Sequence, residues 1–145
     1  MNDNDALKGL PHGPEFRFVD RVVELEPGVR GIGEYRVCGD DPFLKGHFPG
    51  EPILPGVLLV EAAAQLAGVV AQCDPNHAPL AALKLTALRN VKILGTARPG
   101  ETISIHAEIS GRMGGLIQAK AEVFLGETRL VTAELTLAGV PPLNG

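Results

Sequence analysis

The sequence predicts a single α+β domain in which an antiparallel β-sheet wraps around one central helix. Three observations lead to this fold class. One largely apolar segment has helix-forming residues and no proline, several other segments have strand composition and are separated by turn residues, and a length of 145 residues suits one domain. With 45% hydrophobic and 21% charged residues, the composition is that of an ordinary globular protein.

Two strands and a proline-rich loop are expected before the helix. Residues 16–25 and 30–37 have strand composition and flank Glu26-Pro27-Gly28, a turn signal that predicts a hairpin. Residues 39–56 are rich in glycine and proline. Because each proline fixes φ and lacks an N–H donor, this loop is expected to be irregular but stiff, and able to hold a side chain in place.

Residues 57–72, with the sequence VLLVEAAAQLAGVVAQ, are predicted to form the central helix. Pro55 and Gly56 punctuate its start. Apolar residues occupy every face of this helix, which indicates burial on all sides, as by a surrounding sheet. The segment is shorter than the roughly 20 residues that a membrane span needs, and Glu61 and Gln65 interrupt it, so no membrane association is expected.

Four more strands are expected after the helix. They cover about residues 80–94, 102–111, 116–125 and 128–137. The turn residues between these segments favour a meander of sequential strands. We find no internal repeat and no composition change that would indicate a second domain.

Charge and cysteine content argue against several classes of protein. The formal net charge of −4 argues against nucleic-acid binding, which usually requires a basic face. Cys38 and Cys73 lack the spacing of metal ligands, and the histidines show no i, i+4 pairing, so neither a disulfide framework nor a metal site is expected. The acidic, polar start lacks the features of a secretory signal, which predicts a cytoplasmic protein.

Glu61 is the first candidate for chemistry. A carboxylate within an apolar helix is costly to bury without a purpose or a partner, and such a group suits a general acid. Gln65 lies four positions further on, on the same helix face, where it could hydrogen-bond the carboxyl group and fix its orientation. The alternative is a structural carboxylate at a rim or at a subunit contact.

Two further residues are candidates for chemistry, one before the helix and one at its start. His47 lies in GHFPG on the proline-rich loop, where it is either a catalytic base or a structural or solvated histidine. Gly56 opens the helix, where unsatisfied backbone N–H groups could bind a substrate carbonyl and stabilise an enolate-like oxygen. Alternatively, Gly56 only permits the turn.

Residues 75–100 carry a local charge of +4 in this acidic protein. The four cations are Lys84, Arg89, Lys92 and Arg98, and the segment has no acidic residue. The segment is either a docking surface for an acidic partner or a solvated strand face with incidental positive charge.

The segment GHFPGEPILPGVLLVEAAAQLAGV, residues 46–69, resembles the signature of the FabZ-type 3-hydroxyacyl-acyl-carrier-protein dehydratases. It has the histidine of GHFPG, the PGV turn, and the glutamate and glutamine of EAAAQ in the family's spacing. FRFVDRVVELEPG and LRNVKILGTARPGETISIHAEI resemble the family's first hairpin and late strands, so the resemblance covers about residues 10–138. Gly13 and Arg17 depart from the family's first motif, which leaves the acyl chain length open.

The resemblance implies a hot-dog fold, here one domain over residues 1–145, assembled as a homodimer or a trimer of dimers. His47 of one subunit would face Glu61 of the other, and the Gly56 N–H would bind the thioester carbonyl. Phe48, Val57 and Gln65 are also expected to line the substrate site. The resemblance implies no cofactor or metal, and its usual partner is an acidic acyl carrier protein.

The activity that the resemblance implies is dehydration of (3R)-3-hydroxyacyl thioesters in fatty acid or related lipid biosynthesis. His47 would take the C2 proton and Glu61 would protonate the departing hydroxyl group, giving a trans-2-enoyl thioester. A strained, cis His47–Phe48 peptide bond is also suggested. The alternatives are a hot-dog thioesterase and a non-catalytic acyl-thioester-binding subunit. A FabA-type isomerase is disfavoured, since it would call for Asp at position 61.

Overall fold

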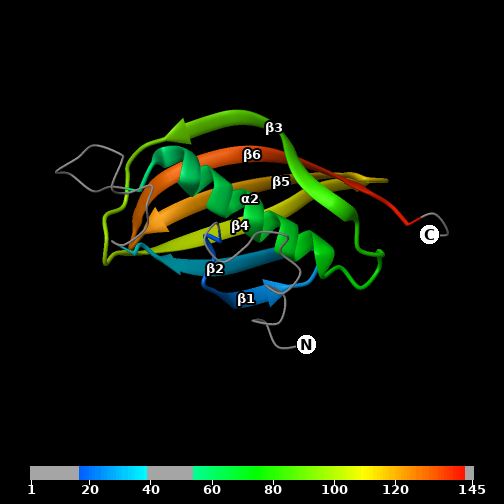
Figure 1. Ribbon diagram of the computed structural model, residues 1–145, viewed down its shortest axis with the longest axis horizontal. Coiled ribbons are helices and arrows are strands. Elements are labelled where there is room, and N and C mark those ends of the chain that lie inside the picture. Colours follow the sequence, from blue (N-terminus) through cyan, green and yellow to red (C-terminus); the bar gives the residue numbers. More distant parts are fainter. Residues whose placement is uncertain (1–16, 39–53, 143–145) are drawn as a thin grey trace.

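The computed structural model describes residues 17–38 and 54–142. Its elements are β1 (Arg21–Glu26), β2 (Arg30–Arg36), α2 (Gly56–Gln72), β3 (Ala81–Ile93), β4 (Thr102–Met113), β5 (Leu116–Leu125) and β6 (Thr128–Val140). The strands form one antiparallel sheet in the order β1-β2-β4-β5-β6-β3, which curves around α2 (Figure 1). The predicted α+β class and the helix wrapped by a sheet are therefore confirmed.

Helix α2 begins one residue before the predicted start and ends at the predicted residue. Pro55 precedes the first turn, and the Leu58 N–H donates to the Pro55 carbonyl at 2.9 Å. From Leu59 to Ala71 every residue except Glu61 is buried, as expected for a helix that the sheet surrounds. Within the described ranges, no helix has the length and apolar character needed to cross a membrane.

Strand β3 does not take the place predicted for it. The sequence predicts a meander of four sequential strands after the helix, but of these four only β4, β5 and β6 are neighbours in chain order. Strand β2 pairs with β4, so that edge of β4 is occupied. Strand β3 pairs with β6 at the far edge of the sheet instead. The meander prediction is therefore wrong for β3, because strand order depends on this long-range pairing.

The pairing of β3 with β6 is irregular. Its register shifts at three places, between Ala81 and Lys84, between Leu85 and Ala87, and between Arg89 and Lys92. Within the first and third of these, Ala82 and Asn90 have φ angles of 52° and 51°, in the left-handed region that non-glycine residues rarely adopt. β3 is therefore a bulged edge strand.

The core lies between α2 and the inner face of the sheet. Alternate residues of the central strands face the helix, for example Ile103 and Ile105 of β4 and Ile117 and Val123 of β5, all fully buried. Small residues on α2, such as Ala63, allow the helix to lie close to the strands. This packing holds α2, and the polar residues on it, in a fixed position.

Arg112 and Asp74 hold the C-terminal end of α2 against the sheet. The Arg112 Nη1 donates to the Ala71 carbonyl at 3.0 Å and lies 3.8 Å from the Asp74 carboxylate. The Asn76 N–H, which donates to Asp74 at 2.8 Å, lowers the pKa of the Asp74 carboxyl group, and His77 and Arg112 add to this effect. Charged groups thus anchor the C-terminal end of α2, whereas Glu61 lies closer to the start of the helix.

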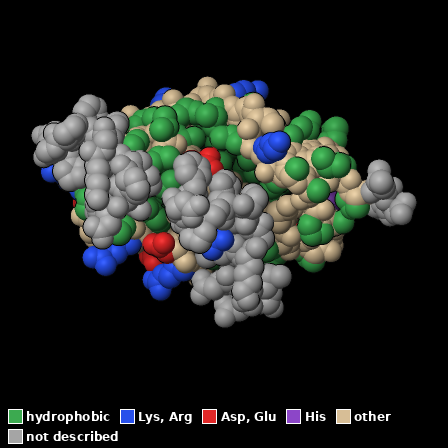
Figure 2. All heavy atoms as spheres, in the orientation of Figure 1, with side chains coloured by type: hydrophobic (Ala, Val, Ile, Leu, Met, Phe, Trp, Pro, Cys, Tyr) green, Lys and Arg blue, Asp and Glu red, His purple; other side chains and the backbone are tan. Residues whose placement is uncertain are grey.

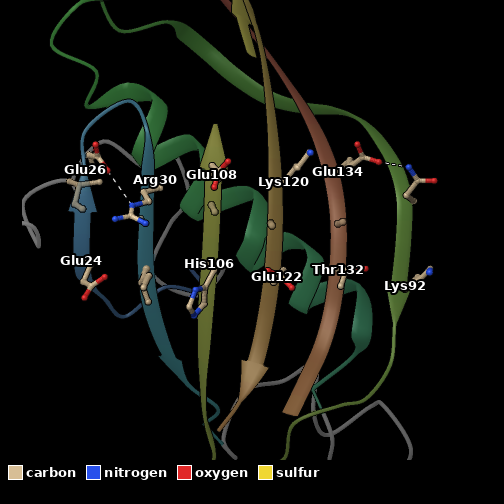
Figure 3. Close-up of a pocket in the computed structure, with 17 residues that line it drawn as sticks. Glu24, Glu26, Arg30, Lys92, His106, Glu108, Lys120, Glu122, Thr132 and Glu134 are labelled. Carbon is tan, nitrogen blue, oxygen red and sulfur yellow. Dashed lines mark hydrogen bonds and ion pairs between the residues drawn. The ribbon is translucent and has the colours of Figure 1, made fainter. Parts of the chain in front are cut away.

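The outer face of the sheet carries a row of register neighbours with alternating charge, which we name the charge row. From β1 to β3 it consists of Glu26, Arg30, Glu108, Lys120, Glu134 and Arg89. Of the neighbouring pairs in this row, Glu26 and Arg30 form an ion pair at 3.2 Å. Figure 3 shows most of these side chains on the face turned away from α2. Opposite charges on neighbouring strands are favourable by about 0.2–1 kcal/mol per pair.

Candidate active site

Glu61 and Gln65 lie on one face of α2, one turn apart. The Gln65 Nε2 donates to Glu61 Oε1 at 3.3 Å. Gln65 is 2% exposed, and among the described residues it is the one polar residue that is buried with the core. Glu61, in contrast, is partly exposed. The expected contact between the two side chains is therefore confirmed, and Glu61 lies where the helix is still accessible.

A backbone group fixes the orientation of the Gln65 amide. The Phe18 N–H donates to Gln65 Oε1 at 2.8 Å. Because this oxygen accepts the Phe18 hydrogen bond, the amide nitrogen is directed to the other side, toward Glu61. Phe18 is itself 1% exposed and packs edge-on against Tyr35, with ring centroids 5.6 Å apart. The hydrogen bonds from Phe18 to Gln65 and from Gln65 to Glu61 hold the carboxyl group from the core side.

The start of α2 presents backbone donors next to an exposed apolar surface. Within the described residues, no hydrogen bond uses the N–H groups of Gly56 and Val57. Val57 is 68% exposed, and Ile93 and Leu94 at the end of β3 are 47% and 60% exposed. Figure 2 shows hydrophobic side chains at the end of the molecule where α2 begins and β3 ends. This surface can receive an apolar group together with a hydrogen-bond acceptor.

Several predicted features lie outside the described residues. These are His47, Phe48 and the suggested cis peptide bond between them. The structure describes a single chain, so the expected approach of His47 to Glu61 of a second subunit also stays a prediction.

A groove on the outer face of the sheet is distinct from the candidate site. It has a volume of about 760 Å³ and is lined by every residue of the charge row except Arg89, and by His106, Glu122 and Lys92 (Figure 3). None of the candidate site residues lines it, and the sheet separates it from α2. In the part of the chain that is described, no cluster of His, Cys, Asp or Glu could hold a metal ion.

Comparison with known proteins gives the family. The model of the FabA-like domain matches residues 10–134. A 3-hydroxyacyl-[acyl-carrier-protein] dehydratase FabZ from Chloroflexus aggregans is 38% identical over 142 residues, covering 98% of both chains. A FabZ from Caldanaerobacter subterraneus is 38% identical over 135 residues, covering 93% of this chain and 95% of its own.

The chain belongs to the FabZ-type dehydratases of the FabA-like family. Solved structures support the fold alone, because their sequences are more distant. The dehydratase heterocomplex ApeI:P from Xenorhabdus doucetiae has a TM-score of 0.78 at 20% identity, covering 99% of this chain and 94% of its own. Zebra fish thioesterase superfamily member 2 has a TM-score of 0.69 at 16% identity, covering 93% and 94%. The predicted hot-dog fold of this FabZ-type chain is thus confirmed.

Sequence reasoning missed two residues that contact the candidate site residues of this FabZ-type chain. The Phe18 N–H that orients Gln65 is a backbone group 47 residues away from it, so no side-chain pattern could indicate it. Ile93 packs directly on Gly56, and strand composition gave no sign of that contact. Both contacts depend on tertiary packing rather than on local sequence.

Proposed function

We propose that this chain dehydrates (3R)-3-hydroxyacyl thioesters carried by acyl carrier protein, with Glu61 and His47 as the catalytic pair. The observation that carries the proposal is the oriented carboxyl group on α2: Phe18 fixes Gln65, and Gln65 donates to Glu61 at 3.3 Å. Membership of the FabZ-type dehydratases supports the reaction class.

In the proposed mechanism the substrate carbonyl accepts a hydrogen bond from the Gly56 N–H, which stabilises negative charge on the oxygen as the C2 proton leaves. His47 accepts that proton. The C3–O bond then breaks, Glu61 supplies the proton that converts the hydroxyl group to water, and a C2–C3 double bond forms. The chain's own groups account for both proton transfers.

The thioesterase alternative has weaker support. A thioesterase would activate water with a carboxylate and would not need a second acid–base residue at the position of His47. The likeness to a solved thioesterase, at 16% identity, concerns the fold only. The presence of both Glu61 and His47 in the sequence therefore favours elimination of water over hydrolysis.

The proposal is tested by incubating the purified protein with crotonyl and longer trans-2-enoyl thioesters of acyl carrier protein. Hydration removes the absorbance of the conjugated enoyl group, and analysis of the products detects a 3-hydroxyacyl thioester. Release of free thiol instead of hydration would support the thioesterase alternative. If the protein catalyses neither hydration nor hydrolysis, the result would support the alternative of a non-catalytic binding subunit.

We also propose a dimer in which β3 lies at the subunit contact. β3 is an edge strand of 13 residues and carries exposed Leu88 and Ile93, and among the described residues no strand pairs with its outer edge. The other edge, β1, has only 6 residues and carries exposed charges that discourage pairing. A second copy of the chain at β3 would also cover the apolar surface at the start of α2.

A shared site predicts complementation between inactive variants. Subunit exchange between His47→Ala and Glu61→Gln dimers should restore activity, because a hybrid dimer can contain one site with both residues intact. With random exchange, half of the dimers are hybrids, so about a quarter of the wild-type sites should become active. Mass spectrometry of the intact dimers checks the exchange, and no recovery after complete exchange would contradict a site built from two subunits.

The positive residues of β3 support an acidic acyl carrier protein as partner. Lys84, Arg89 and Lys92 are exposed, and with Arg98 they form no ion pair within the described residues. Unpaired surface cations can increase the rate at which an acidic protein associates.

Gln65→Leu should lower kcat about tenfold with little change in KM. Leucine is similar in size but cannot orient the Glu61 carboxyl group, and it leaves the buried Phe18 N–H without its acceptor, at a cost of about 1–3 kcal/mol of stability. Steady-state kinetics and chemical denaturation measure the two effects.

Val70→Ala serves as the control for Gln65→Leu. Val70 is fully buried on the same helix, nine residues beyond Glu61, so its truncation also destabilises the protein through a cavity. If Val70→Ala lowers kcat as much as Gln65→Leu does, Gln65 has no orienting role beyond its contribution to stability.

A further inference from the structure

Ile93 lies directly on the first residue of α2. A Cβ atom built on Gly56 would lie 2.8 Å from Ile93 Cγ2 and 3.1 Å from Ile93 Cδ1. Only glycine therefore fits at position 56 without displacing Ile93. Ile93 is nevertheless 47% exposed. Its side chain therefore lies at the surface beside the start of the helix and is not part of the core.

Backbone hydrogen bonds hold the helix start and the end of β3 in place. The Leu54 N–H, just before α2, donates to the Ala97 carbonyl at 2.7 Å. The N–H groups of Leu94 and Gly95 both donate to the Leu130 carbonyl, at 2.7 and 3.3 Å. Because both segments are fixed to the connection after β3 and to β6, Ile93 is held in place beside Gly56.

We propose that Ile93 is a specificity-determining residue that restricts substituents at C2 of the acyl thioester. This inference rests on the proposed function, in which the thioester carbonyl oxygen binds the Gly56 N–H. That oxygen would lie about 2.9 Å from the Gly56 nitrogen. In the proposed binding mode C2, which is bonded to the same carbonyl carbon, lies on the side of Gly56 that Ile93 occupies, so a branch at C2 approaches the Ile93 side chain. Substrates with an unbranched C2 fit, and those with a methyl group at C2 meet the Ile93 side chain.

Ile93→Ala should relax this restriction. The test compares kcat/KM for 3-hydroxybutanoyl and 3-hydroxy-2-methylbutanoyl thioesters, each C2 epimer on the same carrier protein, followed by the absorbance of the enoyl product. The ratio of branched to unbranched kcat/KM should rise at least about tenfold, since one methyl group in an apolar site is worth roughly 10–200-fold in discrimination. Ile93→Val should change the ratio in the same direction by less.

Leu88→Ala is the matched control. Leu88 is on the same strand and is 46% exposed, but it lies five residues before Ile93, so its truncation should leave the ratio unchanged within about twofold. Equal loss of activity toward both substrates in Ile93→Ala and Ile93→Val, with no change in their ratio, would overturn the specificity role and indicate a subunit contact instead. A wild-type protein that does not dehydrate even the unbranched substrate would refute the proposed function itself.

Discussion

Glu61→Gln is expected to lower kcat for dehydration at least about a hundredfold. A general acid in hydrogen-bond reach of a leaving group contributes about 10²–10⁴-fold, and an amide of the same shape cannot supply the proton. The fold should persist, because Glu61 is partly exposed and glutamine keeps its volume. Initial rates with a 3-hydroxyacyl thioester and circular dichroism of the variant measure the two expectations.

Glu108→Gln provides the control for the charge change. Glu108 is an exposed glutamate of the charge row on the opposite side of the sheet, and the same substitution there should leave kcat unchanged. Near-normal turnover of Glu61→Gln would remove Glu61 from the mechanism and would favour the structural carboxylate that the sequence left open.

His47→Ala is expected to lower kcat by a similar factor of at least about a hundred, through loss of the base that removes the C2 proton. The two variants differ in a second measurement. If His47 is the base, His47→Ala should also lose the exchange of the C2 hydrogen of a saturated acyl thioester with deuterium oxide. That exchange needs no departure of the hydroxyl group, so it should depend less on Glu61.

Two results would contradict the role of His47. One is near-wild-type turnover of His47→Ala at saturating substrate. The other is C2 exchange that survives in His47→Ala but is lost in Glu61→Gln, which would make Glu61 the base and exchange the two proposed roles.

The helix and most strands could be predicted because their signals are local. Pro55 and Gly56 mark the start of α2, and turn residues separate β4, β5 and β6, so the predicted ranges agree closely with the observed ones. Strand order is a different property. The position of β3 beside β6 is set by pairing between segments about 50 residues apart, and strand composition does not encode it.

The contacts of the candidate site are likewise of two kinds, local and long-range. The Gln65–Glu61 contact follows from the i, i+4 spacing on one helix, so the sequence was sufficient to predict it. The contacts of Phe18 with Gln65 and of Ile93 with Gly56 join distant segments, and only the folded chain brings them together. The catalytic role of His47 is inferred from the GHFPG motif and the family resemblance. It is tested by the activity and the C2 exchange of the His47→Ala variant.

The charge row has a consequence for how the strands find their register during folding. A slip of two residues is the smallest one that keeps the apolar face of a strand toward the core, so burial alone discriminates poorly against it. In the observed register Lys120 lies between Glu108 and Glu134. Sliding β5 by two residues in one direction would bring Glu122 opposite Glu108 or Glu134 and replace an attraction with a repulsion. The outer face thus disfavours a misfolded register that the core would accept.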